Sequence, residues 1–211
     1  MSVNTWTDSS GNGFGAAKVG TAPVMNTAWA NGNNKNAVTF AGTGGFASTF
    51  TPQWWPSQST VFVVGDITGA GNYQFLSNAV AGGGTLQSNY FIDTNAGNIR
   101  IQIYGDGLSV GPAQAQNAAF VLSLNSPGSA FNKGTKFGGQ PFGCISPPAI
   151  AYPSSLTQGL YLGAHPFQSK YLVGTIAQVI VMPFLNTAQR QAIEAYLGTK
   201  YNVTMTQASN P

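Results

Sequence analysis

The carboxylate side chains decide whether this chain could cleave a glycosidic bond, because that reaction needs two carboxylates placed on either side of the bond. The sequence contains five acidic residues. The only glutamate, Glu194, falls in a predicted helix and forms an i,i+4 pair with Arg190 on its outer face. Asp93 and Asp106 fall near opposite ends of a predicted hairpin, and Asp66 has no acidic companion. No carboxylate pair is therefore predicted.

The other reactive side chains do not form a catalytic set either. His165 is the only histidine, in a loop where we expect it to be solvated, and Cys144 is the only cysteine. A nucleophile triad and a zinc site are therefore excluded. The glycines at 82–84 lack the Lys-Ser/Thr pair and the following helix of a phosphate loop. We predict that the chain is not an enzyme and has no catalytic residue, cofactor or metal.

Recognition chemistry is concentrated on one predicted hairpin. The alternation over residues 98–104 turns three isoleucines toward the core: Ile99, Ile101 and Ile103. The outer face then carries Arg100, Gln102 and Tyr104. A guanidinium, an amide and a phenol on one surface suit a hydroxyl-rich ligand or a protein partner. The alternative, which we favour, is a solvated sheet face.

Two further places offer candidate binding groups. Trp54 and Trp55 directly precede a predicted strand, where adjacent residues point to opposite sides, so one ring is expected in the core and the other is available to stack on a sugar. Asp8 and Asn12 offer oxygen ligands for calcium. The favoured alternative is that Asp8 caps a turn through its own backbone while Trp6 packs inside.

The least regular stretch runs from residue 138 to residue 158. Loops of this length usually carry function or are ordered by a partner. This one is rich in apolar side chains: Phe142, Ile145, Ile150 and Tyr152. We predict that it docks on a neighbouring subunit; folding back over its own sandwich edge is the alternative.

The elements that must position these residues are predominantly strands. Short apolar segments separated by Gly, Pro or Asn predict strands at 37–40, 45–50, 60–66, 73–78, 89–93, 98–104, 118–124, 159–163 and 173–182. No strand-helix-strand pattern occurs, which argues against a parallel sheet. At 211 residues the chain is predicted to form one domain, 1–211, with an all-β antiparallel fold.

The C-terminal fifth is the part on which the fold prediction depends. Residues 174–182 are apolar on both period-2 faces, which predicts a central strand covered on both sides. Asn186 is expected to cap a helix over 187–201, with Gln189 completing a capping box. One stripe of that helix is apolar and is expected to lie on the sheet: Ile193, Tyr196, Leu197 and Tyr201.

Composition narrows the classes of partner. Only 6% of residues are charged, and the net charge of +3 comes from scattered side chains, so nucleic-acid binding is not predicted. No basic, apolar leader occurs in residues 1–20, and no apolar stretch is long enough to span a membrane. We expect synthesis in a cytoplasm and no membrane partner.

Several segments resemble the laminin G-like domains of the concanavalin A-like lectin and glucanase superfamily. They are residues 161–163, 172–181, 185–197 and 200–201, together with the opening at 6–13 and the segment 36–42. The resemblance implies a concanavalin A-like β-sandwich, or jelly roll, that ends in a strand, a short turn and a helix. Gln178 departs from the pattern, since many relatives carry an acidic residue there. The Glu-x-Asp-x-Glu strand of the glucanase branch is absent.

The resemblance also implies a recognition or assembly module. We expect a non-enzymatic structural protein of a phage virion, a capsid decoration or tail-associated subunit, that contacts host surface glycans. Its expected partners are other virion proteins or copies of itself in a homo-oligomer. A bacterial carbohydrate-binding module is the alternative.

Overall fold

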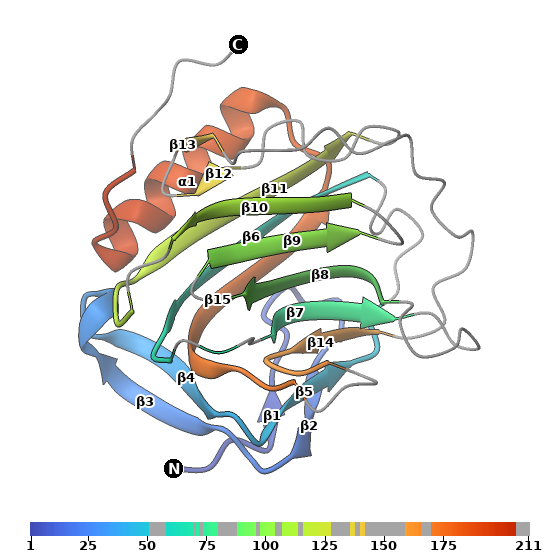
Figure 1. The fold of residues 1–211 in the computed structure, drawn as a ribbon, viewed down its shortest axis with the longest axis vertical. Helices are drawn as coiled ribbons and strands as arrows, with labels where there is room; N and C mark the ends of the chain where they lie inside the picture. The colour runs from blue at the N-terminus through green and yellow to red at the C-terminus, as the bar shows by residue number, and fades with distance from the viewer. Residues whose placement is uncertain are drawn as a thin grey trace.

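Two β-sheets lie face to face in the computed structural model of the chain (Figure 1). The structure describes residues 1–50, 58–69, 71, 74–79, 88–95, 98–103, 107–113, 116–127, 136–137, 140–141, 159–165 and 170–205. In Figure 1 one sheet, with β7, β8 and β9, faces the viewer, and the other, with β6 and β15, runs behind it.

The two sheets contain fifteen strands in the described part of the chain. The first sheet has the spatial order β1 (Thr5–Trp6), β2 (Ala16–Gly20), β5 (Gly44–Ser48), β14 (Leu160–Leu162), β7 (Gln74–Ala79), β8 (Ser88–Asn95), β9 (Asn98–Ile103), β10 (Gly107–Ala113). The second has the order β13 (Gln140–Pro141), β12 (Lys136–Phe137), β11 (Phe120–Pro127), β6 (Gln58–Ile67), β15 (Val173–Pro183), β4 (Lys35–Ala41), β3 (Val24–Trp29). A short 3-10 helix, η1 (Ala30–Gly32), and one α-helix, α1 (Thr187–Tyr201), complete the described elements.

The predicted fold class is confirmed: the described strands pair antiparallel in two sheets, and one C-terminal α-helix follows them. All nine predicted strands are present with shifted ends. The prediction missed six strands: β1, β2, β3, β10, β12 and β13. Of these, β1, β12 and β13 have two residues each, and β2 and β10 are rich in Gly, Ala and Ser, so these five have little apolar alternation to mark them.

A continuous apolar core fills the space between the sheets. Its fully buried aromatic rings meet edge to face: Phe40 against Phe46 at 5.9 Å between centroids, and Phe75 against Phe120 at 5.2 Å. Ile99 is buried in this core, as the alternation along β9 predicted. Fully burying side chains of this size stabilises the fold by about 1.5–3 kcal/mol each.

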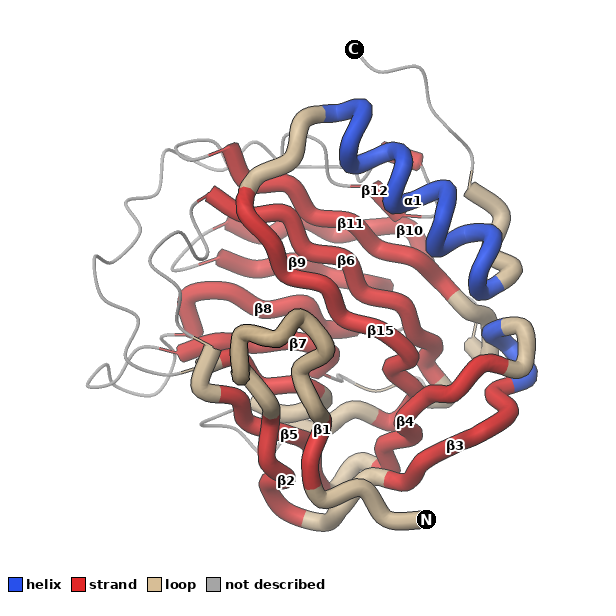
Figure 2. Tube along the Cα trace, turned by 180° about the vertical axis from the view of Figure 1, so that it is seen from behind, coloured by secondary structure: helices blue, strands red, loops and turns tan. Residues whose placement is uncertain are grey.

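A second apolar cluster lies between the outer face of the seven-stranded sheet and α1, which crosses that face in Figure 2. Phe62, Val64 and Val121 from the sheet meet Leu197 and Tyr201 from the helix. The predicted capping box is confirmed, because the Gln189 backbone N–H donates to Asn186 Oδ1 at 2.9 Å and the Asn186 N–H donates to Gln189 Oε1 at 3.1 Å.

The Arg190–Glu194 pair is buried, which corrects the prediction that it lies on the outer face of the helix. Arg190 is 1% exposed and Glu194 is 2% exposed. The Ser123 hydroxyl on β11 donates to Oε1 of Glu194, and Arg190 Nη1 donates to the same oxygen. Tyr196, predicted to face the sheet, is instead 58% exposed. The helix is thus rotated about its axis so that its charged pair faces the sheet, because β11 offers that pair a hydrogen-bond donor.

Gly163 packs too closely against a neighbouring ring to accept a side chain, and this gives a testable prediction. Its φ is +68°, and a Cβ there would lie 2.4 Å from the Phe40 ring. Gly163→Ala should therefore lower the free energy of unfolding by about 2–4 kcal/mol, measured by urea denaturation. Gly13→Ala is the matched control, since Gly13 has a φ of +77° with nothing within 4 Å of the added methyl. A loss at Gly163 no larger than the control's would contradict the packing argument.

β15 has a strand partner on both sides in its first part and on one side only in its second part. It lies between β4 and β6, so the predicted central position is confirmed. Its ladder with β4 ends at Ile176, whereas its ladder with β6 shifts register between Ile176 and Gln178 and continues to Pro183. Over residues 177–183 the edge facing away from β6 has no strand partner among the described residues. The prediction that both faces are fully covered is correct for Thr175 and Ile176 but wrong for residues 177–182, which are half-buried.

Candidate functional site: a cleft beside the open edge of β15

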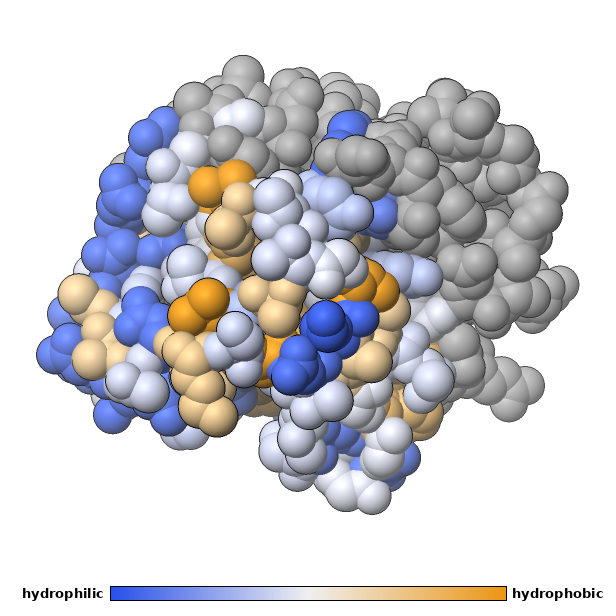
Figure 3. All heavy atoms as spheres, turned by 90° about the horizontal axis from the view of Figure 1, so that it is seen from below, coloured by the Kyte–Doolittle hydropathy of each residue, from blue (hydrophilic) through white to orange (hydrophobic). Residues whose placement is uncertain are grey.

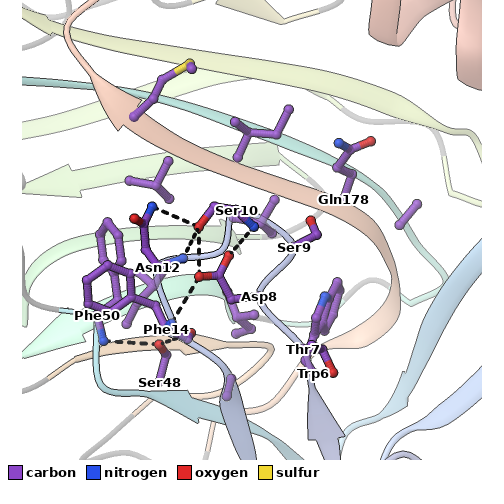
Figure 4. A pocket seen from close by; sticks show the side chains of 18 of the residues that line it. Trp6, Thr7, Asp8, Ser9, Ser10, Asn12, Phe14, Ser48, Phe50 and Gln178 are labelled. Carbon is purple, nitrogen blue, oxygen red and sulfur yellow. Dashed lines mark hydrogen bonds between the residues drawn. The ribbon is translucent and has the colours of Figure 1, made fainter.

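The open edge of β15 forms one wall of a cleft of about 880 Å³. The opposite wall is the loop between β1 and β2, and the ends of β5, β4 and α1 close the sides. Figure 2 shows this loop beside β15, and Figure 4 shows its side chains between β15 and the end of β5. A cleft of this size is in the range of ligand-binding sites in proteins.

Asp8 organises the loop through its own neighbours. Its Oδ1 accepts the Ser10 backbone N–H at 2.8 Å, and its Oδ2 accepts the Ser10 hydroxyl at 2.8 Å and the Phe14 backbone N–H at 3.0 Å (Figure 4). These hydrogen bonds, led by the Ser10 backbone N–H, hold the pKa of the Asp8 carboxyl below its ordinary value. The favoured interpretation of Asp8 as a turn cap is confirmed.

Aromatic rings hold the base of the loop against the sheet. Phe14 and Phe50 meet edge to face at 5.0 Å between centroids, and Trp6 meets Phe46 at 5.7 Å. The Ser48 hydroxyl donates to the Phe14 carbonyl at 2.8 Å and accepts the Phe50 N–H at 3.1 Å. The predicted inward packing of Trp6 is confirmed, since it is partly buried against the core. Phe14 and Phe50 thereby present ring surface on the cleft wall.

The other end of the cleft is formed by Gln178 and the end of α1. Gln178 Oε1 accepts hydrogen bonds from Lys200 Nζ at 2.9 Å and from Tyr201 Oη at 3.0 Å. Asn33 Nδ2 donates to the Lys200 carbonyl at 3.3 Å, which places the start of β4 beside the end of the helix. Gln178 is thus a neutral acceptor that holds two side chains of the helix.

The lining combines apolar, amide, hydroxyl and cationic groups. Four amide side chains line it: Asn12, Asn34, Asn36 and Gln178. Asp8 is the single carboxylate among the described lining residues, and Lys35 and Lys200 are the two cations. The described surface in Figure 3, seen from below Figure 1, likewise shows apolar side chains interleaved with strongly polar ones. Ring faces alternating with amides and hydroxyls can contact a ligand that has both apolar faces and many hydroxyl groups.

The residues predicted from the sequence to contact a sugar or a protein partner are not among the described lining residues of this cleft. Arg100 and Gln102 lie on β9, one strand in from the edge strand β10 of the eight-stranded sheet, and Arg100 is directly opposite Asp93 in the register. The hairpin predicted for this region is confirmed, because Asn95 pairs with Asn98. The other predicted residues lie outside the described residues: Trp54, Trp55, Tyr104, Phe142 and Tyr152. The proposed docking loop at 138–158 lies outside them too, apart from β13.

Several cleft residues were missed by sequence reasoning, among them Phe14, Ser48, Phe50, Lys35 and Lys200. Phe14 carried a usable signal, because an aromatic side chain flanked by Gly13 and Gly15 in a turn-rich loop is out of place unless it packs on something. The others carry no local signal.

His165 is buried, which corrects the prediction of a solvated side chain. It is 7% exposed, and its backbone N–H donates to the Lys170 carbonyl at 3.0 Å. Burial, with a smaller contribution from the Lys170 charge, lowers the pKa of His165 to about 4. The imidazole is therefore neutral at physiological pH and is part of the structure around β14.

Two classes of feature are absent from the described residues. They contain no group of three or more His, Cys, Asp or Glu side chains arranged to hold a metal ion. No helix among them has the length and apolarity needed to cross a bilayer.

Comparisons with solved structures identify the fold. The chain is similar to a Trypanosoma rangeli sialidase in complex with the inhibitor DANA, at 12% identity and a TM-score of 0.67, over 92% of this chain and 32% of the sialidase chain. It is also similar to domain 4 of AbnA, a GH43 extracellular arabinanase from Geobacillus stearothermophilus in complex with arabinotriose, at 15% identity and a TM-score of 0.64 over 92% of both chains. No family model and no curated protein matches the sequence.

These comparisons define the class as a jelly-roll-like antiparallel β-sandwich. They also contradict the prediction that the chain is not an enzyme, because the chains that share its fold belong to a sialidase and an arabinanase. At this level of identity the likeness shows the fold alone, and the chain spans about a third of the sialidase's length. The predicted virion role, homo-oligomer and location stay predictions, since none of these likenesses bears on them.

Proposed function

We propose that this chain is a carbohydrate-recognition domain of the laminin G-like, concanavalin A-like type, and that its saccharide lies in the cleft beside β15. The observation that carries this proposal is the cleft itself, in which Phe14 and Phe50 offer ring surface next to amide and hydroxyl groups. Sugar rings have apolar faces rimmed by hydroxyl groups, so they match such a wall. The arabinotriose bound to the similar arabinanase domain supports the same ligand class.

The open edge of β15 adds main-chain hydrogen-bonding groups to the cleft. In an antiparallel strand alternate residues direct their N–H and C=O to one side. With β6 on one side only, residues 177–183 have main-chain groups that no described strand uses. A linear oligosaccharide lying along this edge would receive regularly spaced donors and acceptors over about 20 Å.

Binding to an oligosaccharide panel tests the proposal directly. We expect Phe50→Ala and Asn12→Ala each to weaken binding of the preferred oligosaccharide about tenfold, measured by isothermal titration calorimetry. Arg100→Ala is the control, since it changes the face predicted from the sequence, on β9, a strand that contributes no described residue to the cleft. Thermal unfolding of each variant confirms that the fold is retained. Loss of binding in Arg100→Ala alone would place the site on β9 and overturn the proposal.

A further inference from the structure

The cationic end of the cleft points to a more specific ligand. Lys35, at the start of β4, and Lys200, near the end of α1, both line it. The hydrogen bond from Asn33 to the Lys200 carbonyl joins the two segments. Two of the eight cationic side chains of the protein therefore lie in one cleft, although charged residues make up only 6% of the sequence.

Lys200 is held in place without having its charge neutralised. Its ammonium donates to the amide oxygen of Gln178 at 2.9 Å and lies 5.0 Å from the ring centroid of Tyr201. An ammonium has three N–H donors, and Gln178 takes one of them. Within the described part of the chain neither Lys200 nor Lys35 has a carboxylate in salt-bridge contact.

The carboxylates near the cleft do not neutralise the charges of Lys35 and Lys200. Asp8 is the one carboxylate among the described lining residues, and both of its oxygens accept hydrogen bonds from its own loop. Arg190 and Glu194 neutralise each other beneath the helix and do not line the cleft. The Gln178 end therefore has a positive potential, focused by the apolar side chains of β15 beside it.

We propose that the saccharide bound in this cleft is acidic, with a carboxylate that pairs with Lys200 and Lys35. This inference rests on the proposed function and narrows it to uronate-type or other carboxylate-bearing glycans. The ammonium groups form charge-assisted hydrogen bonds with the carboxylate, while Phe14 and Phe50 contact the sugar rings further along. Neutral sugars lack the group that these lysines are placed to bind.

A matched pair of ligands tests the charge requirement. Trigalacturonate and the neutral galactotriose differ in their carboxylates, and we expect the wild-type protein to bind the acidic sugar at least tenfold more tightly at low salt. The preference should shrink as sodium chloride is raised, because salt screens exposed charges. Calorimetry with both ligands gives the ratio.

Two lysine variants test which side chains cause the preference for the acidic sugar. Lys200→Met keeps the aliphatic stem, and Lys35→Gln keeps a polar group; each should weaken trigalacturonate binding about tenfold and leave galactotriose unchanged. Lys18→Gln is the control with the same change in net charge, because Lys18 is exposed on β2 and does not line the cleft. It should change affinity for trigalacturonate by less than twofold.

Three results would overturn the inference in distinguishable ways. Equal affinity for the two sugars would remove the acidic ligand and leave the glycan-binding function standing. Failure to bind any sugar in the panel would remove both proposals. Binding of triglutamate with the same dependence on Lys200 and Lys35 would show a general anion site that needs no sugar, and would overturn the saccharide part.

Discussion

Replacing Glu194 with alanine is expected to lower the free energy of unfolding by about 3–5 kcal/mol, because it leaves a buried guanidinium without a counter-charge. Arg190 is 1% exposed, and its Nε has no hydrogen-bond partner among the described residues. The Ser123 hydroxyl would lose its acceptor as well. Chemical denaturation followed by tryptophan fluorescence and circular dichroism measures the loss.

The control for this prediction removes both charges. A double variant, Arg190→Met with Glu194→Leu, replaces the pair by apolar side chains and should recover most of the stability lost in the single variant. A pair on the outer face of the helix, as the sequence predicted, would contribute only about 0.3–0.5 kcal/mol. A cost below about 1 kcal/mol for Glu194→Ala would therefore favour that exposed arrangement and contradict the buried one.

The elements that the sequence predicted well are those with local causes. The helix at Thr187–Tyr201 begins where Asn186 and Gln189, three residues apart, exchange hydrogen bonds. A capping box depends on adjacent residues only, so it can be read without the fold. Alternation along β9 likewise placed Ile99 in the core. Both signals depend only on residues within the element or directly beside it.

The errors arise where distant residues decide the outcome. Glu194 faces the sheet because Ser123, 71 positions earlier, offers it a hydrogen-bond donor. Periodicity along α1 contains no information about that hydroxyl. In the same way, the apolar residues of β15 predicted a covered strand, yet β4 leaves its edge after Ile176. Nothing in the sequence of β15 itself marks that point.

The cleft was the hardest feature to predict because it is assembled from separate segments. Phe14, Phe50, Lys35 and Lys200 come from four elements or loops and meet only after the two sheets pack. Sequence reasoning did single out Asp8 and Gln178. It interpreted Asp8 as the cap of a turn and Gln178 as a position that lacks an acidic side chain. The fold gives them a shared role, since each holds one side of the cleft in place.

Trp29 offers a second prediction with a large expected effect, because it connects the helix to the sheet. It is 3% exposed, and its ring lies 6.2 Å from that of Tyr201, which lines the cleft. Its Nε1 donates to Oδ2 of buried Asp66 at 2.8 Å. Trp29→Ala should therefore lower the free energy of unfolding by at least about 3–5 kcal/mol, measured by urea denaturation.

Trp29→Phe separates the two contributions of this side chain. Phenylalanine keeps most of the packing against Tyr201 but removes the indole N–H, leaving Asn31 Nδ2, at 2.7 Å, as the one remaining side-chain donor to Asp66 among the described residues. That loss should cost about 1–3 kcal/mol, less than the alanine variant. Because Tyr201 and Gln178 keep their hydrogen bond, Trp29→Phe should still bind saccharide below its unfolding temperature. Equal costs for the two variants would mean that ring packing contributes nothing, and that the helix is held against the sheet by other contacts.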